Sequence, residues 1–418
     1  MITNMTHEKT QTTTRDIRKA NRLLILHQLL LRKSGTRQEL RQLTGLSTAT
    51  IANLITEMLE EGLVVETGME TPQVGRPTAI LALNADSGVC VGVDVAETYI
   101  YFDLYDSTLQ NLANYEVELP SSKKEPEEVV QLIVSGLSAL LDKASIEMDR
   151  VVGVGVSIPG PFDHASGVSV FEPSWGWANV PLQAMLEKEL GVPIYMDNPL
   201  KFNAIAEAWY GAGRDVESMA AVVLGTGVGA GLVINGKLYH GASNTAGEWG
   251  HSVVITGGRV CRCGNHGCLE AYVGAPGIIQ TLTEIDPKST LLSADDQTRA
   301  ITAIAAAAKR GNPVALSVVR QTALYLSAGL GSMINILNPE LVILGSWVTS
   351  LLGPVLLPTL VEQIKQHSLE RPYKAVRFVL SDLSQHSVSL GAATLVLEEY
   401  LANPGKKQKR NRSRKGGN

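Results

Sequence analysis

The sequence predicts an α/β protein made of a small helical head followed by a two-lobed body. Capped helical segments with apolar spacing fill the stretch from residue 16 to residue 62. From residue 86 to residue 400, short β-branched runs that end at Gly or Asp alternate with amphipathic stretches. The body contains two glycine-marked sets of strands, and each set is enough for one α/β lobe.

The composition limits the class of protein. A chain of 418 residues is long enough for two or three domains, and its net charge of -5 excludes a polycation, so a nucleic-acid surface must be local. The polar N-terminus lacks the apolar core of a secretory signal, and no apolar run approaches the ~18 residues of a membrane span. We therefore expect a cytoplasmic protein without membrane association. In that compartment, clustered cysteines more often bind metal than form disulfides.

The head contains three segments of helical pattern. The first, "DIRKANRLLILHQLLLRK", carries apolar residues at helical spacing. Thr36 and Glu39 form a capping-box pattern that opens a short helix, "RQELRQLT". After Gly45 at the turn, Ser47 caps a third helix, "TATIANLITEMLEE". A helix, a short turn and a capped helix follow the helix-turn-helix plan.

The third predicted helix has one apolar and one polar face. Its apolar residues are expected to pack on the first two helices: Ile51, Leu54, Ile55, Met58 and Leu59. Short polar side chains near its N-terminus can reach base edges in a major groove, and the helix N-terminus can accept a phosphate. The candidate DNA contacts there are Ser47, Thr48, Thr50 and Asn53. The alternative is an ordinary small helical domain whose polar face is only hydrated.

Charge and a predicted wing favour DNA binding. From Lys9 to Arg41, nine Lys or Arg residues stand against Asp16 and Glu39, which gives a local positive field on an acidic chain. Two strand-like runs with a turn, "LVVETG…GRPTAILALN", predict a wing after the third helix. Arg76, in the Gly-Arg-Pro of that wing, can enter a minor groove; the alternative is an arginine on a plain surface loop.

The body alternates predicted strands and helices. The strand-like runs include "GVCVGVDV", "IYFDLYD", "VVGVGVSIPG" and "AAVVLGTGVGAGLVI". Helical spacing marks "EEVVQLIVSGLSALLDKA" and "LSVVRQTALYLSAGLGSMINIL". The chain ends in "PGKKQKRNRSRKGGN", a basic tail that we expect to be disordered and solvated, with weak attraction to phosphates as the alternative.

Three of the four cysteines fall within eight residues. Zinc favours a tetrahedral set of three thiolates and one imidazole. The candidate ligands are His251, Cys261, Cys263 and Cys268. Four protein ligands would close the site, so the zinc would be structural and would hold the loop that carries Glu270. His266 is a competing ligand, and three buried cysteines beside an unrelated histidine are the remaining alternative.

The segment around His251 resembles the ROK family signature. The histidine is preceded by Gly-Glu-Trp-Gly and followed by C-x-C-G-x-x-G-C-x-E, and the resemblance covers residues 86–400. That family contains bacterial sugar kinases and sugar-responsive transcription repressors. The resemblance implies two actin-like, ribonuclease-H-like α/β lobes with a sugar site in the cleft, and it assigns zinc to the four candidate ligands. The head resembles the winged helix-turn-helix of ROK repressors of the NagC/Mlc/XylR type, which carry G-R-P in the wing.

A sugar pocket is predicted by residue chemistry and by the resemblance together. Carboxylates, amides and imidazoles hold neighbouring sugar hydroxyls with paired hydrogen bonds. By similarity to the family, the residues that line the hexose site are Asn179, Asn198, Glu248, His251 and Glu270. His251 would present one ring nitrogen to zinc and the other to the sugar.

The phosphate-binding turn after the first strand of the body departs from the kinase pattern. ROK kinases carry D-x-G-x-T there, and this chain keeps Asp94 and Thr98. Ala96 replaces the glycine that lets backbone approach phosphate. Glu97 adds a negative charge beside the expected phosphates. Both changes disfavour ATP, although "LGTGVGAG" (224–231) retains the second phosphate motif, or else supplies only a tight β-turn.

The catalytic base of the kinases is also missing. Aligning Asn198 with the first Asn of the family's E-N-D-A-N places Pro199, which has no proton acceptor, at the base position. Asp197 falls on the motif's Glu and is expected to point elsewhere. Ser346 and Trp347 stand where a glycine-rich turn is expected, and the indole would obstruct a nucleotide. We therefore predict no enzyme and no catalytic residue.

These expectations combine into one function hypothesis. The predicted domains are a winged helix-turn-helix (1–85), a small lobe (86–196 plus 384–402), a large lobe with the zinc motif (197–383) and the basic tail (403–418). A sugar or sugar-phosphate effector would change lobe closure and so control binding of operator DNA by a homodimer or a dimer of dimers. We expect a transcription regulator, most simply a repressor of genes for carbohydrate transport or catabolism. The alternatives are an ATP-dependent sugar kinase with an accessory DNA-binding head, and a module whose basic helices dock an acidic protein.

Overall fold

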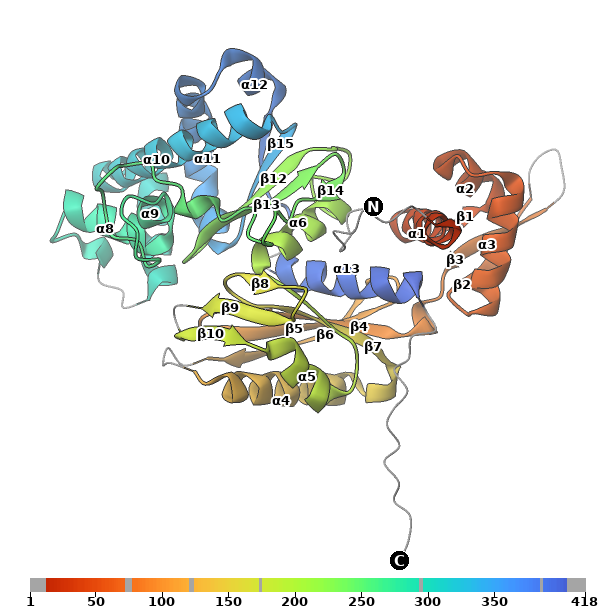
Figure 1. The fold of residues 1–418 in the computed structure, drawn as a ribbon. Coiled ribbons are helices and arrows are strands. Elements are labelled where there is room, and N and C mark those ends of the chain that lie inside the picture. Colours follow the sequence, from red (N-terminus) through yellow and green to blue (C-terminus); the bar gives the residue numbers. More distant parts are fainter. Residues whose placement is uncertain are drawn as a thin grey trace, which may run out of the picture.

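The computed structural model describes residues 13–71, 77–119, 124–172, 175–292, 296–383 and 386–403. Arg76 and the basic tail from residue 404 lie outside the described residues. The described chain forms a head and two lobes, with one helix near the C-terminus lying between them (Figure 1). The two-lobed α/β prediction is confirmed by this arrangement.

The head consists of three helices and a small sheet. The helices are α1 (Thr14–Arg32), α2 (Arg37–Thr44) and α3 (Thr48–Glu60). The strands are β1 (Gly35–Thr36), β2 (Val64–Glu70) and β3 (Thr78–Leu83), in the order β1-β3-β2. Strands β2 and β3 pair antiparallel with a bulge between Glu66 and Gly68, which makes the predicted wing.

Capping residues fix where the helices of the head begin. The Thr36 hydroxyl accepts the Glu39 N–H at 3.3 Å, and the Glu39 carboxylate accepts the Thr36 N–H at 2.7 Å. The Ser47 hydroxyl accepts the Thr50 N–H at 3.1 Å and so caps α3. Gly45 ends α2 at a φ of 69°, a left-handed conformation that glycine adopts without strain. The capping box and the turn predicted from the sequence are both present.

The small lobe is built on a five-stranded sheet in the order β11-β7-β4-β5-β6. Its strands are β4 (Val89–Val95), β5 (Tyr99–Asp106), β6 (Asn111–Glu118), β7 (Val151–Ser157) and β11 (Ile194–Asp197). Helices α4 (Pro126–Ala144) and α5 (Leu182–Leu190) cover one face (Figure 1). Short turns η1 (Ala85–Ser87) and η2 (Met148–Arg150) precede β4 and β7. A second sheet, β10-β9-β8, adds β8 (Phe162–Asp163), β9 (Val168–Glu172) and β10 (Trp177–Val180).

The large lobe is built on a second five-stranded sheet, β14-β13-β12-β15-β16. Its strands are β12 (Met219–Leu224), β13 (Val228–Ile234), β14 (Lys237–Leu238), β15 (Leu341–Gly345) and β16 (Arg377–Leu380). Its helices are α6 (Pro199–Trp209), α7 (Glu270–Val273), α8 (Ala275–Ile285), α9 (Gln297–Lys309), α10 (Pro313–Leu337), α11 (Trp347–His367) and α12 (Glu370–Ala375). Short turns η3 (Trp249–His251) and η4 (Thr290–Leu292) complete it.

Two helices occupy the space between the sheets. Helix α13 (Ser387–Ala402) lies on β4 and β7 of the small lobe and against α6, and α6 lies on β12 and β13 of the large lobe (Figure 1). The approach is close: a Cβ on Gly92 would lie 1.8 Å from the Ser389 carbonyl oxygen, and one on Gly391 would lie 1.9 Å from the Phe202 oxygen. Glycine is therefore required where strand meets helix and where the two helices cross.

The head packs directly on α13. Apolar residues of α1 and α3, including Ile25 and Ile55, share one buried cluster with Ala393 and Leu397. Polar contacts continue this interface, because Arg22 Nε donates to the Leu401 carbonyl oxygen at 2.9 Å. The head therefore shares a hydrophobic core with the helix that lies between the lobes.

The end of α6 also reaches the head. The ring of His27 in α1 lies edge-on to the indole of Trp209, with ring centroids 4.0 Å apart. A small, mainly apolar cavity adjoins this contact, lined by residues of α1, α6 and α13. One helix thus begins at Asn198, a predicted sugar-site residue, and ends against the head.

Among the described residues, one helix, Trp347–His367, is long and apolar enough to cross a membrane by length and composition. In this structure α11 packs along α10, and its buried residues, such as Leu352 and Leu360, belong to the core of the large lobe. A helix that supplies a lobe's core passes the same test of length and hydropathy.

Candidate functional site

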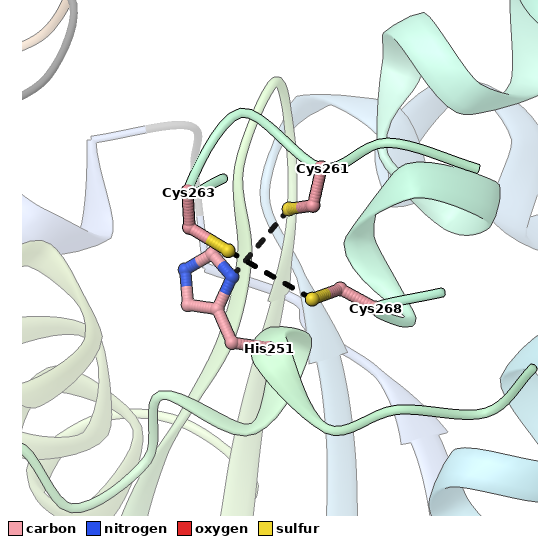
Figure 2. Close-up of side chains that lie close together, drawn as sticks. All are labelled: His251, Cys261, Cys263 and Cys268. Atoms are coloured by element: carbon pink, nitrogen blue, oxygen red, sulfur yellow. Dashed lines mark hydrogen bonds between the residues drawn. The ribbon is translucent and has the colours of Figure 1, made fainter. Parts of the chain in front are cut away.

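The four predicted zinc ligands come together at one point of the large lobe (Figure 2). Their ligand atoms all lie within 4.8 Å of one another. Cys263 Sγ lies 3.8 Å from Cys268 Sγ, and Cys261 Sγ lies 3.7 Å from His251 Nδ1. Zn–S bonds of ~2.3 Å and Zn–N bonds of ~2.0 Å at tetrahedral angles require S···S and S···N separations of about 3.8 and about 3.5 Å. The donor set and its spacing therefore fit zinc, whereas a disulfide needs an S–S length of about 2.0 Å.

The loop that carries the thiols folds tightly around this point. Gly264 and Gly267 have φ angles of 91° and 80°, and a Cβ on Gly267 would lie 1.7 Å from the Ile255 carbonyl oxygen. The Cys261 N–H donates to the Asn265 oxygen at 2.8 Å. His266 is exposed and is not part of the described cluster, so the geometry favours His251 over this competing ligand.

His251 stands between the metal ligands and a carboxylate. Its Nδ1 faces Cys261, and its Nε2 lies 4.0 Å from Glu248 Oε2. Burial raises the pKa of the Glu248 carboxyl, because the charged form is disfavoured away from water. Glu248 Oε1 also accepts the Asn198 side-chain amide at 3.4 Å. Three predicted sugar-site residues are thereby joined in one chain of contacts.

Glu270 lies at the start of α7, beside the thiols. Its Oε2 accepts the Val228 N–H at 3.0 Å, and its Oε1 accepts Arg262 Nε at 2.9 Å and the Cys261 thiol at 3.6 Å. The Arg262 guanidinium continues to Glu97 of the small lobe, with Nη1 2.5 Å from Oε1. An ion-paired bridge therefore joins the lobes at the predicted sugar and phosphate positions.

Asn179 is placed apart from the other four predicted sugar residues. It is exposed on β10 of the small lobe and has a φ of 55°, a conformation that non-glycine residues seldom adopt. None of the contacts described for it joins it to Asn198, Glu248, His251 or Glu270. Its place in the pocket remains a prediction, and its backbone strain is a feature that functional sites often show.

A buried polar group around Asp197 was not foreseen from the sequence. Asp197 accepts His164 Nε2 at 2.8 Å and lies 3.3 Å from Lys201 Nζ, and Lys201 Nζ also donates to the Asn244 carbonyl oxygen at 2.8 Å. Burial alone would raise the pKa of Asp197, but the His164 hydrogen bond and the charge of Lys201 outweigh it and hold the pKa below its ordinary value. Asp197 is thus engaged by His164 and Lys201.

The same group includes His240, whose Nδ1 lies 2.8 Å from Asn244 Oδ1. His164, Asp197 and His240 lie close enough to hold a metal, but the Lys201 ammonium already supplies the positive charge beside the carboxylate. Sequence reasoning missed the group because its members come from three segments far apart in the chain, around residues 164, 197–201 and 240–244. The available signal was Lys201, which stands at the second Asn of the family's E-N-D-A-N pattern.

Side chains of the protein lie at the base position of the kinase pattern and beside the glycines of the second phosphate motif. Pro199 forms the first residue of α6, directly after the capping Asn198. A Cβ on Gly225 would lie 3.2 Å from the Trp347 indole nitrogen, and one on Gly227 would lie 2.5 Å from Arg262 Nη2. The glycine turn of the second phosphate motif therefore has the Trp347 indole beside Gly225 and the Arg262 guanidinium beside Gly227.

The polar end of α3 is open to solvent. Ser47, Thr48 and Asn53 are exposed and Thr50 is half-buried. The Ser47 and Thr50 hydroxyls lie 2.9 Å apart and bond to each other. The predicted apolar face is buried, with Ile51, Leu54, Ile55 and Met58 inside the head.

The positive field of the head is smaller than the sequence suggests. Arg18 pairs with Glu57 and Arg22 with Glu61, while two more of the nine basic residues pair with carboxylates elsewhere, Lys19 with Glu399 and Arg37 with Glu66. The neutralised charges lie between α1, α3, the wing and α13. This pairing reduces the attraction of the head to random phosphates.

Comparison with known proteins agrees with this geometry. The pattern of the ROK family matches residues 90–399. A xylose repressor of Caldicellulosiruptor bescii is 29% identical over 398 residues, which cover 93% of this chain and 98% of that protein. A glucokinase of Halalkalibacterium halodurans is 32% identical over 319 residues, which cover 74% of this chain and 95% of that enzyme.

A solved structure shares the whole fold. The crystal structure of a ROK family transcriptional regulator, a homologue of the E. coli Mlc protein, matches with a TM-score of 0.79 at 24% identity. The match covers 93% of this chain and 97% of that one, so it includes nearly all of both chains. The expected order of a head followed by two α/β lobes is confirmed.

Proposed function

Because the chain belongs to the ROK family, we propose that it is a sugar-responsive, DNA-binding transcription regulator whose kinase-like body no longer transfers phosphate. The observation that carries the proposal is the continuous packing from cleft to head. Helix α6 is capped by Asn198 in the cleft and ends at Trp209 against α1. Occupancy of the cleft can therefore be transmitted to the DNA-reading part through packed helices.

The head supplies the DNA contacts. Helix α3 would enter a major groove, with Thr48 and Asn53 toward base edges and Ser47 and Thr50 near phosphate. Arg76 would add a minor-groove contact from the wing. A homodimer, or a dimer of dimers, would place two such heads over the half-sites of a palindromic operator. A repressor is the simpler outcome, since the relative that matches nearly the whole chain is named a xylose repressor.

The cleft supplies the effector site. Asn198, Glu248, His251 and Glu270 present amide, carboxylate and imidazole groups, which suit the hydroxyls of a sugar. Asn179 would complete the pocket from the small lobe. D-xylose is the first candidate because of the xylose repressor relatives, and D-glucose is the second because of the glucokinase relative. The effector switches DNA binding only if it binds the two head arrangements unequally.

Zinc would be held by His251, Cys261, Cys263 and Cys268 in a structural role. With four protein ligands, no open position is left for a substrate. Bound zinc would fix the imidazole so that Nε2 faces Glu248, and it would hold the loop that bears Glu270. The metal would thus orient the pocket without taking part in chemistry.

The proposed loss of kinase activity rests on the base position and on the glycine turn of the second phosphate motif. Pro199 has no proton acceptor at the base position, and Asp197 is paired with His164 and Lys201. The Arg262 guanidinium and the Trp347 indole cover the second glycine turn. The glucokinase relative keeps a second hypothesis in view, namely a sugar kinase with an accessory head.

The test begins with DNA. Purified zinc-loaded protein is used to select fragments from genomic DNA, and a panel containing D-xylose and D-glucose is then screened for release of the selected fragments. Release by one sugar without ATP is the expected result. Glu248→Gln should keep operator affinity and lose the response, while Glu370→Gln, a matched change of an exposed carboxylate on α12, should behave as wild type. Failure to select any fragment, or steady ATP-dependent phosphorylation of a panel sugar, would contradict the proposal.

A further inference from the structure

Glu97 and Arg262 form an ion pair between the Asp94–Thr98 turn and the glycine turn at 225–227, which correspond to the two phosphate motifs. Arg262 Nη1 lies 2.5 Å from Glu97 Oε1, at the first turn. Its Nη2 covers the second turn, 2.5 Å from the point where a Cβ on Gly227 would stand. One guanidinium thus occupies the space that both turns would otherwise offer to phosphate oxygens.

The ion pair also contacts one of the proposed effector-binding residues. Arg262 Nε donates to Glu270 Oε1 at 2.9 Å, and Glu270 is one of the proposed sugar-binding carboxylates. The Glu270 side chain is only 6% exposed, whereas those of Arg262 and Glu97 are 40% and 31% exposed. The pair is therefore more exposed to solvent than the carboxylate that it contacts, and it lies next to the groups that would hold the sugar.

The charges around this position disfavour an anion. Arg262 is already shared by two carboxylates, Glu97 and Glu270. Lys201, the other cation near Glu248, is buried and bonded to Asp197 and to the Asn244 carbonyl oxygen. A phosphate ester carries a charge of about −1.5 to −2 at pH 7 and would meet cations that are fully paired.

We infer that the Glu97–Arg262 pair restricts the effector to uncharged sugars by standing where a sugar phosphate or a nucleotide would place its phosphate. The inference rests on the proposed function, since it names the chemical class of effector for the same cleft. Glu97 is the deciding residue: its carboxylate satisfies the guanidinium and repels an incoming phosphate. Without that carboxylate, Arg262 Nη1 is free to make a charge-assisted hydrogen bond to a phosphate oxygen.

Inorganic tripolyphosphate tests the pair without knowledge of the sugar. Binding to the zinc-loaded full chain is measured by titration calorimetry for wild type, Glu97→Gln, the double variant Glu97→Gln with Arg262→Gln, and the control Glu370→Gln. Glu97→Gln should bind at least about tenfold more tightly than wild type, the size of one charge-assisted hydrogen bond. The double variant should lose this gain, and the control should match wild type. Zinc content and the thermal midpoint of each variant check that it is folded.

The inference is overturned if wild type binds tripolyphosphate as tightly as Glu97→Gln, or if the gain survives removal of Arg262. A second arm compares D-glucose with D-glucose 6-phosphate. Wild type should bind the uncharged sugar more tightly than its phosphate ester. In Glu97→Gln, the ratio of the affinity for D-glucose to that for D-glucose 6-phosphate should fall by about tenfold. Wild type binding the phosphate ester more tightly also overturns the inference. If the tripolyphosphate pattern holds but no sugar alters operator binding, the proposed function fails while the phosphate-excluding role of the pair stands.

Discussion

His27 reports on the contact between the head and the body through its pKa. The ring lies in α1 with its centroid 4.0 Å from that of Trp209, and burial lowers the pKa of His27 to about 4 from an ordinary value of 6.5. Because the folded pKa is depressed, the neutral ring stabilises docking above pH 6.5, and this stability is lost as the pH falls toward 4. A pKa difference of one unit between the folded and unfolded states corresponds to ~1.36 kcal/mol, so the free energy of unfolding should fall by about 1.3 kcal/mol between pH 7.5 and pH 5.5.

The assay has a direct and an energetic part. NMR of histidine-labelled protein should show one ring, absent from His27→Phe, that stays neutral at pH 5.5. In urea unfolding, the free energy of unfolding of wild type should fall by about 1.3 kcal/mol more than that of His27→Phe between pH 7.5 and 5.5. The reason is that phenylalanine keeps the contact with Trp209 but cannot be protonated. His367→Gln, a change at an exposed histidine of α11, should follow wild type. A His27 ring that titrates near pH 6.5, or parallel pH profiles for wild type and His27→Phe, would refute the docked position of α1.

Three further predictions concern the other parts of the protein. Burial raises the pKa of Asp94 to about 6, so the contribution of its protonated carboxyl to stability is lost as the pH rises through that value. Between pH 4 and pH 7, the unfolding free energy of Asp94→Asn should therefore fall by about 2 kcal/mol less than that of wild type. Equal falls for the two proteins in urea unfolding would contradict this prediction. Cys263→Ser should contain no zinc, as measured by elemental analysis, and should also lose effector binding. Cys90→Ala, a change at a cysteine outside the cluster, should keep both zinc and effector binding. Normal sugar binding by zinc-free Cys263→Ser would show that the metal does not hold the pocket. Asn53→Ala should weaken operator binding by about 1–3 kcal/mol in gel-shift titrations and leave sugar binding intact. Thr56→Ala, on the same helix, should have little effect on operator binding. Equal losses of operator affinity in the two variants would argue against a base contact by Asn53.

Local patterns in the sequence predict the head and the metal centre well. The capping box of Thr36 and Glu39, the Ser47 cap and the apolar face of α3 are interactions between residues close in the chain, so their spacing encodes them. The cysteines of the metal centre lie in one short loop, and its tight turns are set by nearby glycines. Each of these features needs little information from the rest of the fold.

The contacts between lobes depend on the tertiary fold and could not be derived from spacing. Glu97 and Arg262 are 165 residues apart, and only the closure of one lobe on the other brings them together. The sequence indicates that the charge of Glu97 repels phosphate, but it does not reveal the guanidinium partner of that carboxylate. The paired arginines of the head were overestimated as a free positive field for the same reason: Arg22 and Glu61 meet only when α1 packs on α3.

We expect that a sugar bound between the lobes changes DNA binding and is not converted to a sugar phosphate. The most direct measurement follows both quantities in one sample: a selected operator fragment with a fluorescent label, zinc-loaded protein, Mg²⁺ with ATP, and the releasing sugar. The anisotropy of the labelled DNA should fall at the same sugar concentration with and without ATP, and the recovered sugar should carry no phosphate. Accumulation of sugar phosphate over many turnovers, or a release that requires ATP, would contradict the account.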